Sequence, residues 1–188
     1  MERRQLLKTA GVLGTGGLTS LAGCTGGSED GESGAAPTAT KTQETADGSA
    51  DSNTVMMVTD GSQYYFDPIG LFVEPGETVT FEIKNGSHSA TAYKKGTSTA
   101  SVTRIPEGAE AFNSETLSEK GATYEHTFET PGTYDYFCIP HKSLGMVGRI
   151  VVGEPGGPAE GSMPPDGKVP KSQTIVDQGS VSYSEFSG

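Results

Sequence analysis

A short stretch of the chain holds three side chains that could bind a metal ion together. Cys138, His141 and Met146 follow the spacing Cys-x2-His-x4-Met, directly after an aromatic segment that ends at the cysteine. Thiolate sulfur favours Cu(I), imidazole suits both oxidation states of copper, and a weak axial methionine tunes the reduction potential. Zinc fits less well, because structural zinc normally uses paired cysteines. These residues therefore predict one copper ion per chain, cycling between Cu+ and Cu2+.

A second imidazole must come from elsewhere in the chain, and two histidines are candidates. His88 follows a turn signal at Asn85–Gly86, where a loop can carry it to one end of a β-sandwich. His126 lies on the apolar side of the alternating stretch 122–128, where a lone histidine is more often packed than ligating. We therefore favour His88 and keep His126 as the alternative. The triplet Asn85–Ser87 also matches a glycosylation acceptor, but a glycan there would crowd the metal, so we favour the turn.

The segment from residue 54 to residue 153 has the pattern of short strands. Apolar residues recur at every second position, as in Val79-Phe81-Ile83 and in residues 122–128, which is the period of a half-buried strand. Gly- and Pro-containing turn signals separate these runs. No long helical period occurs, so we predict an all-β antiparallel sandwich or barrel. The exception is the longer connection 105–117, where we expect a turn of helix.

The N-terminal residues have the features of a targeting segment. Arg3 and Arg4 open a mildly apolar, glycine-rich stretch that resembles a twin-arginine export signal. Residues 21–24 read Leu-Ala-Gly-Cys, which looks like the site where a signal peptide is cleaved and Cys24 is lipidated. We predict a signal peptide over 1–23. The alternatives are an ordinary secretory signal and, for Cys24, a leftover free thiol.

The segments that flank the strand-rich region have another composition. Residues 24–53 lack aromatic and branched apolar residues and are rich in Gly, Ser, Thr and acid, so we expect a disordered, lipidated tether. Residues 154–188 read as a Gly/Pro-rich C-terminal tail, whose last part either adds one short strand or remains loose. The predicted organisation is thus a signal peptide, a linker, a copper domain over 54–153 and a tail.

The charge of the chain excludes several classes of protein. Its formal net charge is -11, which argues against nucleic acid and against electrostatic attachment to anionic lipid. So acidic an exported chain suggests a salt-rich habitat. The three histidines are too few for an enzyme that needs an additional histidine-rich copper site, such as a multicopper oxidase. We therefore expect no enzymatic activity.

Taken together, residues 54–153 resemble the plastocyanin-type blue copper proteins, and most closely the halocyanins of halophilic archaea. The resemblance implies a Greek-key cupredoxin sandwich of about eight strands. It implies His88, Cys138 and His141 as equatorial copper ligands and Met146 as the axial ligand. It further implies a monomeric, mobile one-electron carrier, which would be lipid-anchored on the extracellular face of the cell membrane and shuttle electrons between respiratory membrane proteins. A copper storage or sensing module is the alternative function.

Three positions bear on the details of this resemblance. Many relatives carry Asn directly after the first histidine, where it braces the cysteine loop, but this chain has Ser89. The outward aromatic residue before the cysteine is Phe137, where plant-type proteins have tyrosine, so a second electron exit through a phenol is not expected. We expect His141 to be the exposed ligand and electron port, ringed by Pro140 and Leu144.

Overall fold

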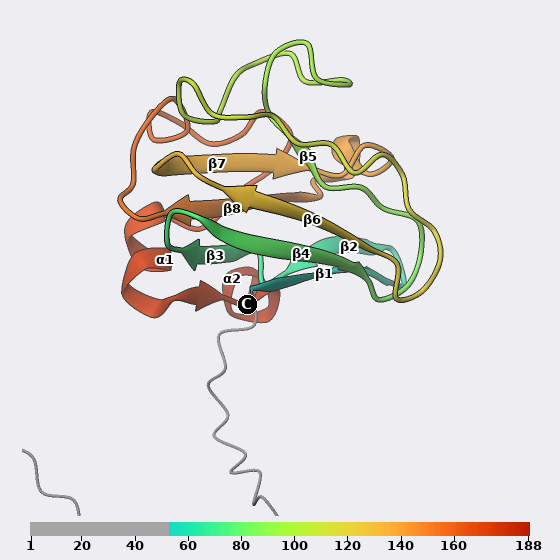
Figure 1. The fold of residues 1–188 in the computed structure, drawn as a ribbon. Helices are drawn as coiled ribbons and strands as arrows, with labels where there is room; N and C mark the ends of the chain where they lie inside the picture. Colours follow the sequence, from blue (N-terminus) through green and yellow to red (C-terminus); the bar gives the residue numbers. More distant parts are fainter. Residues whose placement is uncertain (1–52) are drawn as a thin grey trace, which may run out of the picture. The chain divides into compact units, whose positions relative to one another are not determined.

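Two β-sheets lie face to face in the part of the chain that the structure, a computed structural model, describes, residues 53–188 (Figure 1). The predicted all-β class is confirmed. The export arginines Arg3 and Arg4, the lipidation residue Cys24 and the predicted linker up to residue 52 lie outside the described residues. Within residues 53–188 no helix has the length and apolar character needed to cross a membrane.

The first sheet has four strands in the order β2-β1-β4-β6. Its strands are β1 (Thr54–Asp60), β2 (Gln63–Asp67), β4 (Glu77–Ile83) and β6 (Thr123–Phe128). β1 runs parallel to β4, whereas β2 and β6 pair antiparallel to their neighbours. Alternation decides which side faces inward: in β4, Val79, Phe81 and Ile83 are fully buried.

The second sheet has five strands in the order β5-β7-β8-β3-β9. Its strands are β5 (Thr91–Ala92), β7 (Gly132–Phe137), β8 (Val147–Val152), β3 (Gly70–Val73) and β9 (Ser180–Val181). β3 runs parallel to β8, and the other pairs are antiparallel. The core between the sheets takes apolar side chains from both, among them Phe66, Phe81, Tyr136 and Ile150.

The expected turn of helix in residues 105–117 is wrong. This connection contains no helix, and its backbone forms isolated bridges between Leu117 and His88 and between Asn113 and Thr91. Ile105 and Phe112 of this connection are buried in the core, so residues 105–117 cover a side of the sandwich that the strands leave open. An extended path places these side chains inward and still satisfies the backbone hydrogen bonds.

The C-terminal residues 154–188 pack against the second sheet. Of the two possibilities for the end of the chain, the short strand is observed, because β9 pairs with β3. The segment also forms two helices, α1 (Ser172–Gln178) and α2 (Tyr183–Ser187), drawn in red beside β3 in Figure 1. Ile175 of α1 packs in a cluster with Ile69, Val151 and Val181. The residues after 153 therefore belong to the same compact unit as the strands before them.

Candidate metal centre

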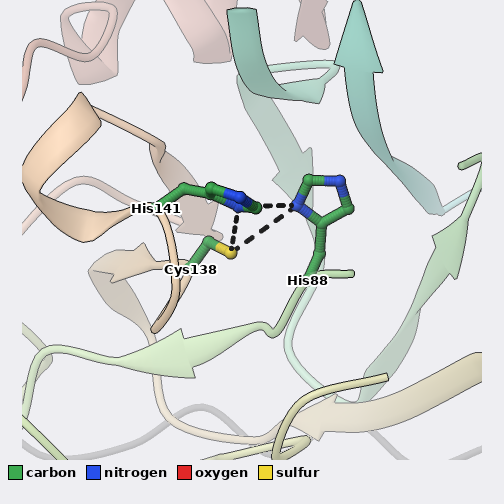
Figure 2. Close-up of side chains that lie close together, drawn as sticks. All are labelled: His88, Cys138 and His141. Atoms are coloured by element: carbon green, nitrogen blue, oxygen red, sulfur yellow. Dashed lines mark hydrogen bonds between the residues drawn. The ribbon is translucent and has the colours of Figure 1, made fainter. Parts of the chain in front are cut away.

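Three predicted ligands meet at one end of the sandwich. His88, Cys138 and His141 place their ligand atoms within 4.8 Å of one another, and Figure 2 shows the side chains pointing toward a common point. Cys138 Sγ lies 3.7 Å from His88 Nδ1 and 3.4 Å from His141 Nδ1, and the two Nδ1 atoms are 3.2 Å apart. His88 and Cys138 are fully buried.

A tight loop after β7 carries Cys138, His141 and Met146. The loop begins directly after Phe137 and contains the short 3-10 helix η1 (Lys142–Leu144). The Cys138 amide donates to the Met146 carbonyl at 3.0 Å, and the Met146 amide donates to the His141 carbonyl at 3.2 Å. Gly145 ends η1 with a φ of 86°, a left-handed conformation that glycine adopts at little cost. The spacing of the ligands thus matches a loop whose two ends are joined by backbone hydrogen bonds, with Met146 fully buried at the second end.

His88 is held in the tautomer that a metal needs. Its Nε2 lies 3.0 Å from the Asn85 carbonyl oxygen and 3.0 Å from Thr59 Oγ1. A carbonyl only accepts, so Nε2 carries the proton and Nδ1 keeps its lone pair toward Cys138 and His141. Gly86 permits this approach, because a Cβ at that position would overlap Thr59 Oγ1.

In the same turn, the Asn85 side chain has a structural role. The Asn85 side chain accepts a hydrogen bond from the Thr59 amide at 2.9 Å and donates to the Thr59 carbonyl at 2.8 Å. Both ends of the amide are therefore used to hold the turn to β1. A side-chain amide with these two contacts fixes the loop that leads to His88.

Ser89 braces the cysteine loop, although the resemblance left this contact in question. Its Oγ accepts a hydrogen bond from the Ile139 amide at 2.8 Å, and its own amide donates to Cys138 Sγ at 3.4 Å. The Oγ also lies 3.2 Å from Thr91 Oγ1. The hydroxyl thus connects the loop of the first histidine to the loop of the cysteine.

Burial shifts the pKa values of all three groups. Burial and then the neighbouring His141 lower the pKa of His88 to about 4, against the opposing effect of its bond to the Asn85 carbonyl. Burial likewise lowers the pKa of His141 and raises the pKa of the Cys138 thiol, which hydrogen bonds from the amides of Ser89 and His141 partly offset. Both imidazoles are therefore neutral at pH 7, and a metal cation would displace the thiol proton.

His141 is the ligand that reaches the surface. Its side chain is partly exposed. The neighbouring Pro140 and Leu144 are more exposed, and the exposed fraction of Leu144 is 62%. The Tyr64 ring stacks on the His141 ring, with centroids 3.9 Å apart and planes 12° from parallel. Sequence reasoning missed Tyr64, since it lies in β2, far from the ligand spacing, and nothing in the residues around it points to a histidine partner.

Phe137 faces away from the main core, as expected, but it is fully buried. The residues around it are Tyr93, Ala100, Val147 and Val169, and Val169 comes from the C-terminal segment. The side of the sheet next to Cys138 is therefore covered in this chain.

His126, the alternative ligand, is not brought to this cluster. Its ring packs against Phe112 and Phe128, with centroid distances of 4.8 Å and 4.7 Å. Burial lowers its pKa, although the charge of Glu110 opposes the shift. This is the packed histidine that the strand pattern of residues 122–128 indicates.

The residues fit a copper ion. Two neutral imidazole nitrogens and one cysteine sulfur converge, and Cys138 is the only cysteine among the described residues. Two nitrogens and one sulfur with a methionine nearby form the donor set of blue copper sites. Backbone hydrogen bonds hold the buried Met146 beside Cys138, so its place is consistent with the predicted axial position.

Comparison with known proteins gives the same cofactor. The family described as copper binding proteins, plastocyanin/azurin family, matches residues 33–153. A chloroplastic plastocyanin of Hordeum vulgare is 31% identical over 108 residues, 56% of this chain and 65% of that protein. A halocyanin of Natronomonas pharaonis is 34% identical over 91 residues, 47% of this chain and 48% of that protein. The chain thus spans less than two thirds of the length of these two relatives.

A solved structure is also similar. It is a pseudoazurin from Sinorhizobium, 30% identical, with a TM-score of 0.45 over 67% of this chain and 91% of that chain.

Proposed function

The chain belongs to the plastocyanin/azurin family of copper-binding proteins, and from this premise we propose that it is a one-electron carrier with a single type 1 copper site. The observation that carries the proposal is the convergence of His88 Nδ1, Cys138 Sγ and His141 Nδ1 within 4.8 Å. Bound copper supplies a one-electron couple between Cu(I) and Cu(II). The chain's own residues supply the rigid, largely buried setting for it.

Rigidity of the ligands is what fast electron transfer requires. The hydrogen bond to the Asn85 carbonyl fixes the His88 ring, and Ser89 holds both the Cys138 sulfur and the Ile139 amide that follows it. Because the ligands are placed before a metal arrives, little rearrangement accompanies a change of charge at the site. Burial of His88 and Cys138 keeps water away from two of the three donors.

Electrons would enter and leave through His141. It is the only one of the three clustered donors with exposed surface, and the exposed Pro140 and Leu144 beside it offer an apolar face. Such a face suits brief docking of a redox partner, which needs close approach without tight binding. Phe137 is covered, so an exit through the side of the second sheet is not proposed.

Copper loading tests this function. Protein produced with copper should contain one copper ion per chain, show the intense absorption of a thiolate bound to Cu(II), and give a reversible one-electron response in voltammetry. The variant Cys138→Ser should lose the absorption. A colour that survives this substitution would place the site elsewhere, and copper binding without a reversible response would favour storage or sensing.

We also propose that the carrier is anchored to the outer face of the cell membrane by a lipid on Cys24, with membrane redox proteins as donor and acceptor. The support is the sequence Leu-Ala-Gly-Cys after a twin-arginine-like start. Stable anchoring would then rest on the lipid and not on the acidic domain. Cell fractionation of Cys24→Ala should show release or an uncleaved precursor, and a variant that fractionates like the original protein would contradict the anchor.

A further inference from the structure

Lys142, the residue after the ligand His141, is held on the outer side of the second sheet. Its Nζ lies 4.6 Å from the centre of the Phe137 ring and 5.6 Å from that of Tyr93. The ammonium group donates to the Thr99 carbonyl at 2.7 Å. A lysine that contacts two aromatic faces in this way has less freedom than a surface lysine. The loop that carries His141 is therefore tied to its surroundings at its next residue.

Asp166, in the C-terminal segment, completes this arrangement. Its Oδ2 lies 3.6 Å from Lys142 Nζ and accepts a hydrogen bond of 2.7 Å from the Tyr93 hydroxyl. The Lys142 and Asp166 side chains are only 16% and 26% exposed, so solvent screens the pair less than it screens a pair on an open surface. The carboxylate thus neutralises the ammonium charge and is itself fixed by Tyr93.

The backbone next to Asp166 packs on the far end of the same loop. A Cβ on Gly167 would lie 2.9 Å from the Gly145 carbonyl oxygen and 2.7 Å from Val147. The two segments of the chain therefore pack so closely that only glycine fits at this position. Val169 continues the contact, because it packs with Phe137 and Val147. The C-terminal segment therefore contacts the copper loop in its middle, through Lys142, and near its end, through Gly145.

We propose that Asp166 is a positioning residue of the copper site, which acts through Lys142 to fix the loop 139–146 and to balance the charge beside His141. The proposal rests on the copper site proposed above. It assigns the C-terminal segment a part in setting the properties of the metal, in addition to completing the second sheet.

The charge balance between Lys142 and Asp166 predicts the direction in which each substitution shifts the reduction potential of the copper. An uncompensated positive charge near the site disfavours the oxidised state, which carries one more positive charge than the reduced state. Asp166→Asn leaves Lys142 uncompensated and should raise the reduction potential, while its amide oxygen can still accept from Tyr93. Lys142→Met leaves Asp166 uncompensated and should lower the potential. The double variant should return toward the original value, because the two partners are removed together.

Voltammetry of the copper-loaded full chain measures these shifts. The matched control is Asp177→Asn, which removes the same charge from an exposed residue of the same segment, hydrogen-bonded to Gln173. Opposite shifts in the two single variants, each larger than the shift in the control, support the proposal. Potentials that match the control in both single variants overturn it, even if the melting temperatures fall, because a merely structural role would move only stability.

Hydrogen exchange of the copper-free protein supplies a second readout that does not depend on the metal. The amides of Leu144, Gly145 and Met146 are hydrogen-bonded within the loop. They should exchange faster in Asp166→Asn than in the original protein and in Asp177→Asn, because local opening becomes easier. Equal exchange in all three would contradict the positioning role. A chain that binds no copper would refute the proposed function, and this exchange comparison would still decide whether Asp166 holds the loop.

Discussion

Ser89 joins two loops that are far apart in the sequence. Its hydroxyl accepts from the Ile139 amide, and its amide donates to Cys138 Sγ. The spacing Cys-x2-His-x4-Met predicts the ligands because all three are local to one loop. The contact of Ser89 depends on the meeting of residues about fifty positions apart, so the residue type alone left open how the loops are connected.

Substitution of Ser89 by alanine should weaken this connection. The Ile139 amide would lose its partner in a partly buried place, which costs about 1–3 kcal/mol of unfolding free energy. Urea denaturation of the copper-free protein measures this loss, with Ser87→Ala as the control, since Ser87 is exposed. A variant with the same midpoint as the control would show that the hydroxyl is not a brace.

The assignment of His88, and not His126, as the second imidazole ligand can be tested directly. His88→Gln should abolish the intense absorption of the copper-loaded protein, because it removes an Nδ1 atom from the cluster. His126→Gln should leave the spectrum nearly unchanged, because that ring packs on Phe112 and Phe128. Visible spectra of the two variants at equal copper content make the comparison. A bleached His126→Gln protein would reverse the assignment.

At the scale of elements, a buried charge cluster joins β7 and β8 to the C-terminal segment. Asp135 of β7 is fully buried and accepts from Arg104 Nε and Arg149 Nε, each at 2.7 Å. Both guanidinium groups also donate to the Ala159 carbonyl, at 2.9 Å and 3.0 Å. The second sheet and the segment after it are therefore held by shared hydrogen bonds as well as by apolar contact.

Removal of the central carboxylate should destabilise the domain strongly. Asp135→Asn removes the negative charge between two buried guanidinium groups. Breaking such a buried ion pair lowers the free energy of unfolding by about 3–5 kcal/mol. Chemical denaturation at constant pH would measure the change. Asp60→Asn is the control, because Asp60 is exposed and its substitution should stay within about 0.5 kcal/mol. A small loss in Asp135→Asn would mean that the remaining acceptors, backbone carbonyls and serine hydroxyls among them, satisfy the arginines without the carboxylate charge.

Periodicity predicted the strands better than it predicted the connections between them. In β4 the alternating apolar residues are the buried ones, because one face of the sheet meets the core. Asp135 and Arg149 interrupt such a pattern inside strands, and their burial is intelligible only once the C-terminal segment covers them. The same holds for residues 105–117, whose extended path follows from the open side of the sandwich that Phe112 fills.

At the scale of the whole molecule, acidic residues outnumber basic ones. The chain has 24 Asp and Glu against 13 Lys and Arg, and two of those bases, Arg104 and Arg149, are buried beside Asp135. Repulsion between the exposed carboxylates is long-ranged in dilute buffer and is screened within about 3 Å at 1 M salt.

The melting temperature of the copper-loaded protein should therefore rise between low salt and about 1 M KCl, where the screening length falls most. Thermal unfolding followed by circular dichroism, at fixed copper content, tests this expectation. Copper content must be constant because metal bound to the native state alone adds stability. A flat melting temperature would show that the acidic surface contributes little to stability.

The pairing of β9 with β3 determines when the second sheet can be completed during synthesis of the protein. The strands join residues 180–181 to residues 70–71, and the Tyr183 amide donates to Asp67 Oδ1 across a separation of 116 residues. A ribosome delivers the chain from the N-terminus, so one edge of β3 remains unpaired until the more than one hundred residues between β3 and β9 have been synthesised. Such long-range closure slows folding. The second sheet is therefore completed after translation has passed residue 181, and a chain that stalls earlier exposes the edge of β3 to other chains.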